Sequence, residues 1–242
     1  MKKNFAILIT GHLRTFETNI KYLNKIFKNF DIYAYTLDTR EHFKILRNLA
    51  IKNFELVNDN EINMKEFTRY NKLFNNPRSV NIDSQLPREN SGWLKQLKDY
   101  SDSINWFNDV VKKEYDFIVR YRPDLKPVKT KNVRFVENEF NCFQQNIYNN
   151  HINDKFFLSN KKIMTLFMNN MFHALKDENI YKYKDEAFNV EEFIFSFLKV
   201  NSLKINLLDK NKLKFKKNVD GKLLSAGFNQ YHYKSIKHKF LD

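Results

Sequence analysis

The hydrophobic pattern of the first 57 residues predicts strands and helices in alternation. Residues 5–10 form a continuous apolar run that ends at Gly11, which is typical of a parallel strand buried on both faces. Apolar residues then recur at helical spacing from Phe16 to Phe27. Two further strands are predicted at residues 31–36 and 54–57, on either side of a helix at residues 40–49. This order predicts an α/β fold with a doubly wound, mostly parallel sheet flanked by helices.

The middle of the chain predicts a long helix followed by a central strand. Apolar residues at helical spacing from Trp93 to Val111 lead into a β-branched and aromatic run at residues 115–120. That strand must end near Pro123, because proline cannot continue the ladder of hydrogen bonds. Later elements are predicted as a short strand at 133–136, helices at 161–175 and 190–198, and a last strand at 205–208.

Length and composition predict one domain over residues 1–242. Of the 242 residues, 42% are hydrophobic, including 24 Phe and 12 Tyr, which is enough apolar surface for one large core. Within this domain we expect the polar residues 58–90 to be a mobile excursion and residues 209–242 to be a basic C-terminal extension. The single cysteine, Cys142, indicates a reducing compartment, and no apolar window reaches the length of a membrane span, so a cytoplasmic protein is expected.

The formal net charge of +14 indicates either an anionic partner or a solvated coat of lysines. The lysine run at residues 210–217, which contains Phe215, is a candidate for peripheral contact with an anionic membrane at its inner face. A solvated strand or tail is the favoured alternative for that run. Both interpretations stay open at this point.

The first segment that could carry chemistry follows the first strand. Gly11 supplies a turn, and a helix that begins just after it would offer free backbone N–H groups to a phosphate. Arg14 would add a two-pronged contact with an anion, and His12 could donate a hydrogen bond. The segment has neither a Walker loop nor a Gly-x-Gly-x-x-Gly pattern. A simple turn with a surface arginine is the alternative.

The second segment is the end of the central strand. Alternation along a strand puts Arg120, Arg122 and Asp124 on one face, so two guanidinium groups and a carboxylate should project together. A carboxylate in this place can hold a divalent cation against a diphosphate. An internal salt bridge is the alternative explanation.

These two segments carry a resemblance to a known group of proteins. The stretches ITGHLRTFETN…FDIYAYT and YDFIVRYRPDL resemble a group of uncharacterised bacterial and viral sugar transferases, in which one strand ends in Ser-Gly-x-x-Arg and a later one in Arg-x-Arg-Pro-Asp-Leu. The stretches INDKFFLSNKKIMTLF and NVEEFIFSFL are similar to two further segments of that group. The resemblance implies a GT-A-like fold, a nucleotide-diphosphate sugar donor, and a role in the synthesis of capsule, lipopolysaccharide or another surface glycan.

The resemblance also implies roles for individual residues. Gly11 and Arg14 would contact the nucleotide or its phosphates, and Asp124 would stand where a metal-binding Asp-x-Asp motif usually lies. A Mn or Mg ion with a UDP-type or GDP-type sugar donor is therefore expected. Because position 122 is Arg, the first acid of that motif is missing, and Arg120 and Arg122 could instead neutralise the diphosphate themselves.

Three residues complete the predicted site. Asp154, together with Asp124, is a candidate catalytic carboxylate, because inverting transfer needs a group that accepts the proton of the acceptor hydroxyl. A helix-proximal cap or surface acid is the alternative for Asp154. Trp93 and Gln96 lie one helical turn apart and could place a ring and an amide near the donor, although a core position is the simpler explanation for Trp93.

The sequence thus favours a glycosyltransferase that uses a nucleotide sugar and a glycan or lipid-linked acceptor. The alternative from another class is a non-catalytic module that binds nucleic acid or another polyanion, suggested by the charge and the many aromatic residues. No RNP-type, zinc-finger or helix-turn-helix signature supports nucleic acid as a partner. A transferase fold without activity is a third alternative.

Overall fold

The computed structural model describes residues 3–11, 13, 16–49, 51–58, 62–69, 91–144, 152–183, 190–219 and 222–225. The strands are β1 (Phe5–Thr10), β2 (Phe30–Leu37), β3 (Asn53–Val57), β4 (Phe117–Tyr121), β5 (Leu125–Thr130), β6 (Phe140–Gln144), β7 (Ile152–Ser159), β8 (Ile205–Leu207), β9 (Leu213–Val219) and β10 (Lys222–Ser225). The α-helices are α1 (Phe16–Asn19), α2 (Arg40–Asn48), α4 (Ser91–Val110), α5 (Lys161–Ala174) and α6 (Val190–Val200), with 3-10 helices η1 (Ile20–Lys25), η2 (Met64–Phe67) and η3 (Ile180–Lys182).

Seven strands form one sheet in the order β3-β2-β1-β4-β7-β6-β8. β1 pairs in parallel with both β2 and β4, and β2 pairs in parallel with β3. β7 runs antiparallel to its neighbours β4 and β6, while β6 and β8 are parallel. The predicted α/β architecture with a mostly parallel, Rossmann-like sheet flanked by helices is therefore confirmed.

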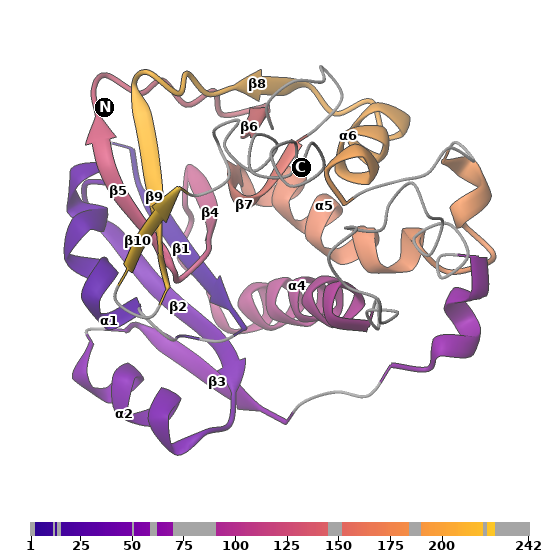
Figure 1. The fold of residues 1–242 in the computed structure, drawn as a ribbon, viewed down its shortest axis with the longest axis horizontal. Helices are drawn as coiled ribbons and strands as arrows, with labels where there is room; N and C mark the ends of the chain where they lie inside the picture. The colour runs from indigo at the N-terminus through magenta and orange to yellow at the C-terminus, as the bar shows by residue number, and fades with distance from the viewer. Residues whose placement is uncertain are drawn as a thin grey trace, which may run out of the picture.

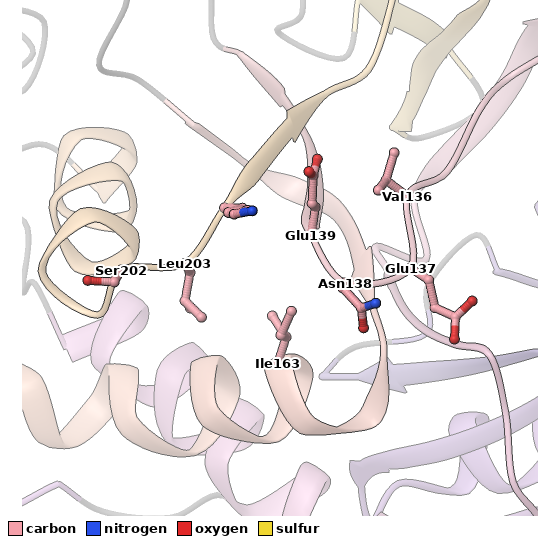
Figure 2. A pocket seen from close by; sticks show the side chains of 8 residues that line it. Val136, Glu137, Asn138, Glu139, Ile163, Ser202 and Leu203 are labelled. Atoms are coloured by element: carbon pink, nitrogen blue, oxygen red, sulfur yellow. The ribbon is translucent and has the colours of Figure 1, made fainter.

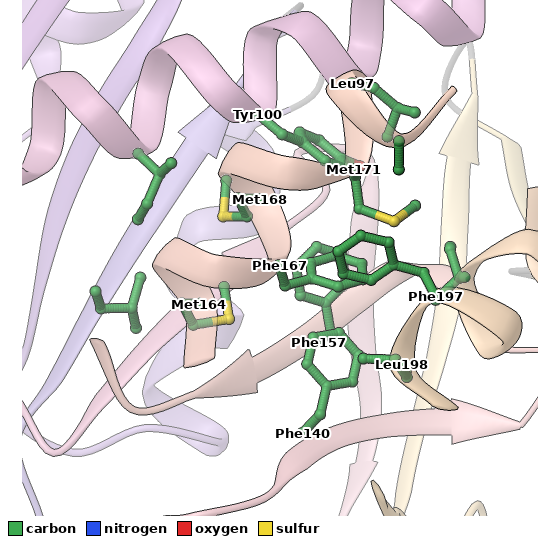
Figure 3. Packing of buried hydrophobic residues seen from close by; sticks show 14 of the residues in the cluster. Leu97, Tyr100, Phe140, Phe157, Met164, Phe167, Met168, Met171, Phe197 and Leu198 are labelled. Carbon is green, nitrogen blue, oxygen red and sulfur yellow. The ribbon is translucent and has the colours of Figure 1, made fainter. Parts of the chain in front are cut away.

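Two hydrophobic cores lie on opposite faces of this sheet. One core joins the sheet to α4, α5 and α6, and Figure 3 shows Met164, Met168 and Met171 of α5 packed with Phe157 and Tyr100. The other core joins the sheet to α1, η1, α2 and a small sheet with the order β10-β9-β5. In Figure 1 the small sheet and α4–α6 lie on either side of the large sheet. Both faces are covered, which explains why β1 is apolar and buried along its whole length.

The small sheet was not predicted. After the turn at Pro123 the chain does not leave the sheet region but enters β5, which pairs antiparallel with β9. Leu125 on β5 and Phe215 on β9 point into the second core, which is what holds the small sheet in place. The strand predicted at 133–136 is wrong, because these residues form no regular element and Val133 and Phe135 only pack against the core.

Residues 62–69, within the expected excursion at 58–90, pack against the end of α5. Phe67 on η2 is buried, and the carboxylate of Asp177 accepts hydrogen bonds from the backbone N–H groups of Thr68 and Arg69 at 3.0 and 2.7 Å. Lys176 and Glu66 add an ion pair at 2.5 Å. The rest of that excursion, at 59–61 and 70–90, lies outside the described residues.

The expected C-terminal extension at 209–242 contributes β9 and β10 to the small sheet, and residues 226–242 lie outside the described residues. Phe215 faces inward, so the predicted contact of its ring with lipid does not fit this packing. Among the described helices, none combines the length and apolarity that a membrane span requires.

Candidate functional site

The strand order places a topological switch point between β1 and β4. The chain goes from β1 outward to β2 and β3, and then returns through α4 to β4 on the other side of β1. Loops that follow two such parallel strands diverge and leave a crevice at their carboxyl ends, where open α/β sheets bind ligands. Both predicted segments begin there, because Gly11 follows β1 and Arg122 follows β4.

Gly11 occupies the turn after β1 with a φ of 78°. A Cβ at this position would meet nothing within 4 Å, so the backbone conformation rather than space is what favours glycine. The predictions for His12 and Arg14 fall outside the described residues. Asn19, at the end of α1, donates a hydrogen bond from its amide to the carbonyl of Pro123 at 3.0 Å, so the helix that follows the first segment touches the second segment directly.

His42 fixes the turn after β1, a role that sequence reasoning missed. Its Nε2 accepts a hydrogen bond from the backbone N–H of Leu13 at 3.3 Å, which requires a neutral imidazole with the proton on Nδ1. Nδ1 lies 3.0 Å from Thr36 Oγ1 and 3.1 Å from the carbonyl of Leu37. The Thr36 hydroxyl in turn donates to the carbonyl of Gly11. Both side chains are buried, so β2 and α2 hold both ends of the turn.

Arg120 is buried at the end of β4, on the α4 side of the sheet. One terminal nitrogen (Nη1) donates to the carbonyls of Asp154 and Lys155 at 3.0 and 2.9 Å. The guanidinium carbon lies 5.0 Å from the centre of the Tyr100 ring, a cation–π geometry. Its Nε is buried without a hydrogen-bond partner within the described structure. Arg120 therefore joins β4, β7 and α4 and retains one donor for a further group.

Arg122 and Asp124 form an ion pair across the turn that follows β4. Arg122 Nε lies 2.9 Å from Asp124 Oδ1, and Nη2 donates to Oδ2 at 3.1 Å. The Asp124 side chain is 13% exposed and that of Arg122 is 28% exposed, so both reach solvent at the mouth of the site. This pair is the internal salt bridge that stood as the alternative interpretation, and it is compatible with a ligand contact by Arg122.

The arrangement around Asp124 does not fit a metal site as it stands. Both carboxylate oxygens face the Arg122 guanidinium. Across the described residues, no group of three or more His, Cys, Asp and Glu side chains is placed to hold a metal ion. A divalent cation would therefore have to displace a guanidinium that is already paired.

Asp154 comes to the site because the pairing of β6 and β7 is irregular. The register shifts between Cys142 and Gln144, and as a result Ile152 and Phe157 both enter the same core although they are five positions apart. The Asp154 side chain meets α4, where Gln96 Nε2 lies 3.4 Å from its Oδ2. The same Gln96 amide also donates to the Tyr100 hydroxyl.

Tyr100 lies at the centre of this charge cluster. Burial raises the pKa of its phenol to about 12, and the carboxylate of Asp154 acts in the same direction, while the charge of Arg120 opposes them. The phenol therefore stays protonated at physiological pH and can hold Gln96 and Arg120 in place. Trp93, one turn before Gln96, packs with its ring 6.0 Å from that of Phe193 on α6, which places it in the core between helices.

Two pockets lined by described residues lie at the other end of the strands, away from the carboxyl ends of β1 and β4. One of about 570 Å³ is bordered by the segment before β6, the first turn of α5 and the segment before β8, and Figure 2 shows Leu203 and Ile163 pointing toward it. The other, of about 390 Å³, is lined by Lys3, Phe5 and Phe117 among others, at the amino ends of β1 and β4. Neither touches the residues gathered at the switch point.

No protein-family model matches the chain, and a search of curated proteins finds no match.

Proposed function

We propose that this chain is a glycosyltransferase with a GT-A-like fold, which transfers a sugar from a nucleoside-diphosphate sugar to a surface-glycan or lipid-linked acceptor. The observation that carries the proposal is the meeting of six polar residues at the switch point between β1 and β4. They are Gln96, Tyr100, Arg120, Arg122, Asp124 and Asp154. The strand β4 with the turn after it, the strand β7 and the long helix α4 bring them together.

The two arginines suit a diphosphate leaving group. When the bond between the sugar C1 and the phosphate oxygen breaks, its electron pair stays on the diphosphate, and positive groups nearby stabilise that charge. Arg122 is partly exposed and can turn a guanidinium edge toward a phosphate, and Arg120 offers its buried Nε. Because cations in a site with little water act more strongly than in bulk water, this pair can neutralise the leaving group.

Asp154 suits the role of general base. In this step the acceptor hydroxyl forms the new bond to C1, and its proton passes to the carboxylate of Asp154. Gln96 orients that carboxylate from α4, while Arg120 holds the backbone at the same residue through the Asp154 carbonyl. Asp124 then acts by orienting Arg122, as their ion pair indicates.

A Mn or Mg ion at Asp124 stays a prediction, and the Arg122–Asp124 pair argues against it. We expect nucleotide-sugar binding to persist in the presence of a chelator, since the arginines can neutralise the diphosphate. Retention of binding after chelation would agree with this assignment, whereas loss of binding that added Mn²⁺ restores would return Asp124 to the role of metal ligand.

The binding half of the proposal is tested by thermal unfolding with a panel of UDP-, GDP-, CMP- and dTDP-sugars. A ligand at about 100 times its dissociation constant should raise the melting temperature of a chain of this size by about 5–10 °C. Arg122→Ala should abolish the shift, whereas Arg134→Ala, an exposed arginine at the other end of the strands, should retain it. Absence of any shift across the whole panel would count against a nucleotide-sugar enzyme.

The catalytic half is tested with Asp154→Asn. This change preserves the shape and the contact with Gln96 but removes the proton acceptor. With the donor that gives the shift, transfer or donor hydrolysis should fall by about 10²–10⁴-fold while the melting shift persists. Unchanged turnover in Asp154→Asn would remove Asp154 from the reaction.

A further inference from the structure

Four of the elements that cover the second face of the large sheet carry lysines and no acids. η1, β5, β9 and β10 together contain eight lysines and not one Asp or Glu. The helices on the other face carry both positive and negative side chains. The first turn of α6, for example, contains Glu191 and Glu192. In Figure 1 the small sheet lies across the large sheet from α4, α5 and α6. These four elements therefore carry only positive charge, whereas α1 and α2 on the same face each contribute one acid, Glu17 and Glu41.

Three of these lysines surround one tyrosine. The ammonium nitrogens of Lys126, Lys25 and Lys21 lie 4.3, 5.0 and 5.4 Å from the centre of the Tyr22 ring. The Lys126 ammonium lowers the pKa of the Tyr22 phenol, and the charges of Lys21 and Lys25 act in the same direction. Tyr22 lies on η1 and Lys126 on β5, so the cluster joins the helix to the small sheet.

Among the described side chains, Lys21, Lys25, Lys126, Lys129 and Lys214 form no ion pair with an acid. The ion pairs among described residues use other cations, such as Lys3, Lys98, Lys113 and Arg122. Lys129 on β5 even lies directly across from Lys214 on β9. Like charges placed opposite each other repel and destabilise a sheet, so an external anion would stabilise this arrangement.

The same surface has an apolar component. Val128, between Lys126 and Lys129 on β5, is 40% exposed, although the neighbouring Leu125 and Pro127 are buried. Tyr22 adds an aromatic ring with a polar end. An exposed aliphatic side chain and a tyrosine surrounded by lysines are the combination that lies at the headgroup level of a bilayer.

We propose that this surface, the lysine face formed by Lys21, Tyr22, Lys25, Lys126 and Val128, docks on a membrane that contains anionic phospholipids. The lysines meet the phosphate groups of the lipids, and Val128 enters the headgroup region. Lys126 comes two residues after Asp124, and Asn19, just before η1, contacts Pro123. Docking would therefore hold the switch-point site beside the bilayer. The link to a lipid-linked acceptor rests on the proposed function, whereas the docking itself does not.

The test is sedimentation of the full chain with vesicles of phosphatidylcholine alone and with about 30% phosphatidylglycerol. We expect binding only to the anionic vesicles, and weaker binding as salt is raised. A triple Lys21→Glu, Lys25→Glu and Lys126→Glu variant should bind at least about 100-fold more weakly. The matched control changes net charge by the same amount but alters exposed lysines at or next to α4, α5 and α6, namely Lys112→Glu, Lys162→Glu and Lys199→Glu. This control should bind the anionic vesicles almost normally.

Three results would overturn the proposal: equal binding to both kinds of vesicle, equal losses in both triple variants, or oligonucleotide binding that depends on the lysine face without any vesicle binding. The last result would assign the surface to nucleic acid. Circular dichroism of both variants checks that they fold. Because the vesicle assay contains no donor, its failure leaves the nucleotide-sugar melting shift untouched, and the two proposals fail separately.

Discussion

At the scale of single residues, buried hydrogen bonds position the candidate site. The turn after β1 depends on Gly11 for its positive φ and on His42 and Thr36 for its orientation. These two side chains come from α2 and β2, far from the turn in sequence. Leu13 N–H faces a buried imidazole, so removal of the acceptor would leave a buried donor unsatisfied.

This network predicts the effect of changing His42. Replacement by Leu should destabilise the fold by about 1–3 kcal/mol, because the Leu13 N–H and the Thr36 hydroxyl both lose a partner. Replacement by Gln, whose side-chain oxygen can accept from Leu13, should cost less. Urea unfolding monitored by fluorescence measures both values. If the two variants are equally stable, the imidazole does not hold the turn.

At the scale of elements, Asp31 joins three segments at the amino edge of the sheet. Asp31 is the second residue of β2. Its carboxylate accepts hydrogen bonds at 2.7 Å from Lys113 and from the hydroxyl of Tyr115, and the Lys52 ammonium lies 3.7 Å away. Tyr115 also pairs with Tyr33 at 2.7 Å. Burial alone would raise the pKa of Asp31, but Lys113 and Tyr115 bring it below its ordinary value of 3.8.

A lowered pKa in the folded state predicts a specific pH dependence. The stability that Asp31 contributes is fully present above pH 4 and is lost as pH falls through the folded-state pKa, because protonation then favours the unfolded chain. Asp31→Asn should therefore destabilise by about 1 kcal/mol at pH 7, with a smaller difference below pH 4. Denaturant unfolding across this range measures it. Glu114→Gln, an exposed acid nearby, is the control and should change little at either pH.

Elements defined by local pattern were predictable, and those defined by pairing over long distances were not. The apolar run of β1, the spacing of α4 and the proline after β4 are local signals, and these elements appear as predicted. β5 and β9 meet only through a contact across about 90 residues, which no local pattern reports. The same holds for the site. Alternation predicted that Arg120, Arg122 and Asp124 would share one face, and the contact of Arg120 with Tyr100 places Arg120 on the α4 side. The approach of Asp154 to Gln96 depends on an irregular register that no local pattern reports.

At the scale of the whole molecule, the large sheet separates two cores that share no helix. Cys142, the only cysteine in the chain, lies in the core on the α4–α6 side, on β6 between β7 and β8. It is fully buried, and burial raises the pKa of its thiol. Its reactivity therefore reports how often this core opens to solvent.

This thiol predicts how ligand binding and global stability are connected. In the native protein a thiol reagent at pH 8 should react only at the rate of unfolding, and in denaturant it should react at once. A nucleotide sugar that binds only the folded chain should slow the native reaction by a factor of one plus the ratio of its free concentration to its dissociation constant. Cys142→Ala, which removes the thiol, is the blank. Fast native labelling that the ligand leaves unchanged would mean that the β6–β8 edge opens by itself, independently of the switch-point site.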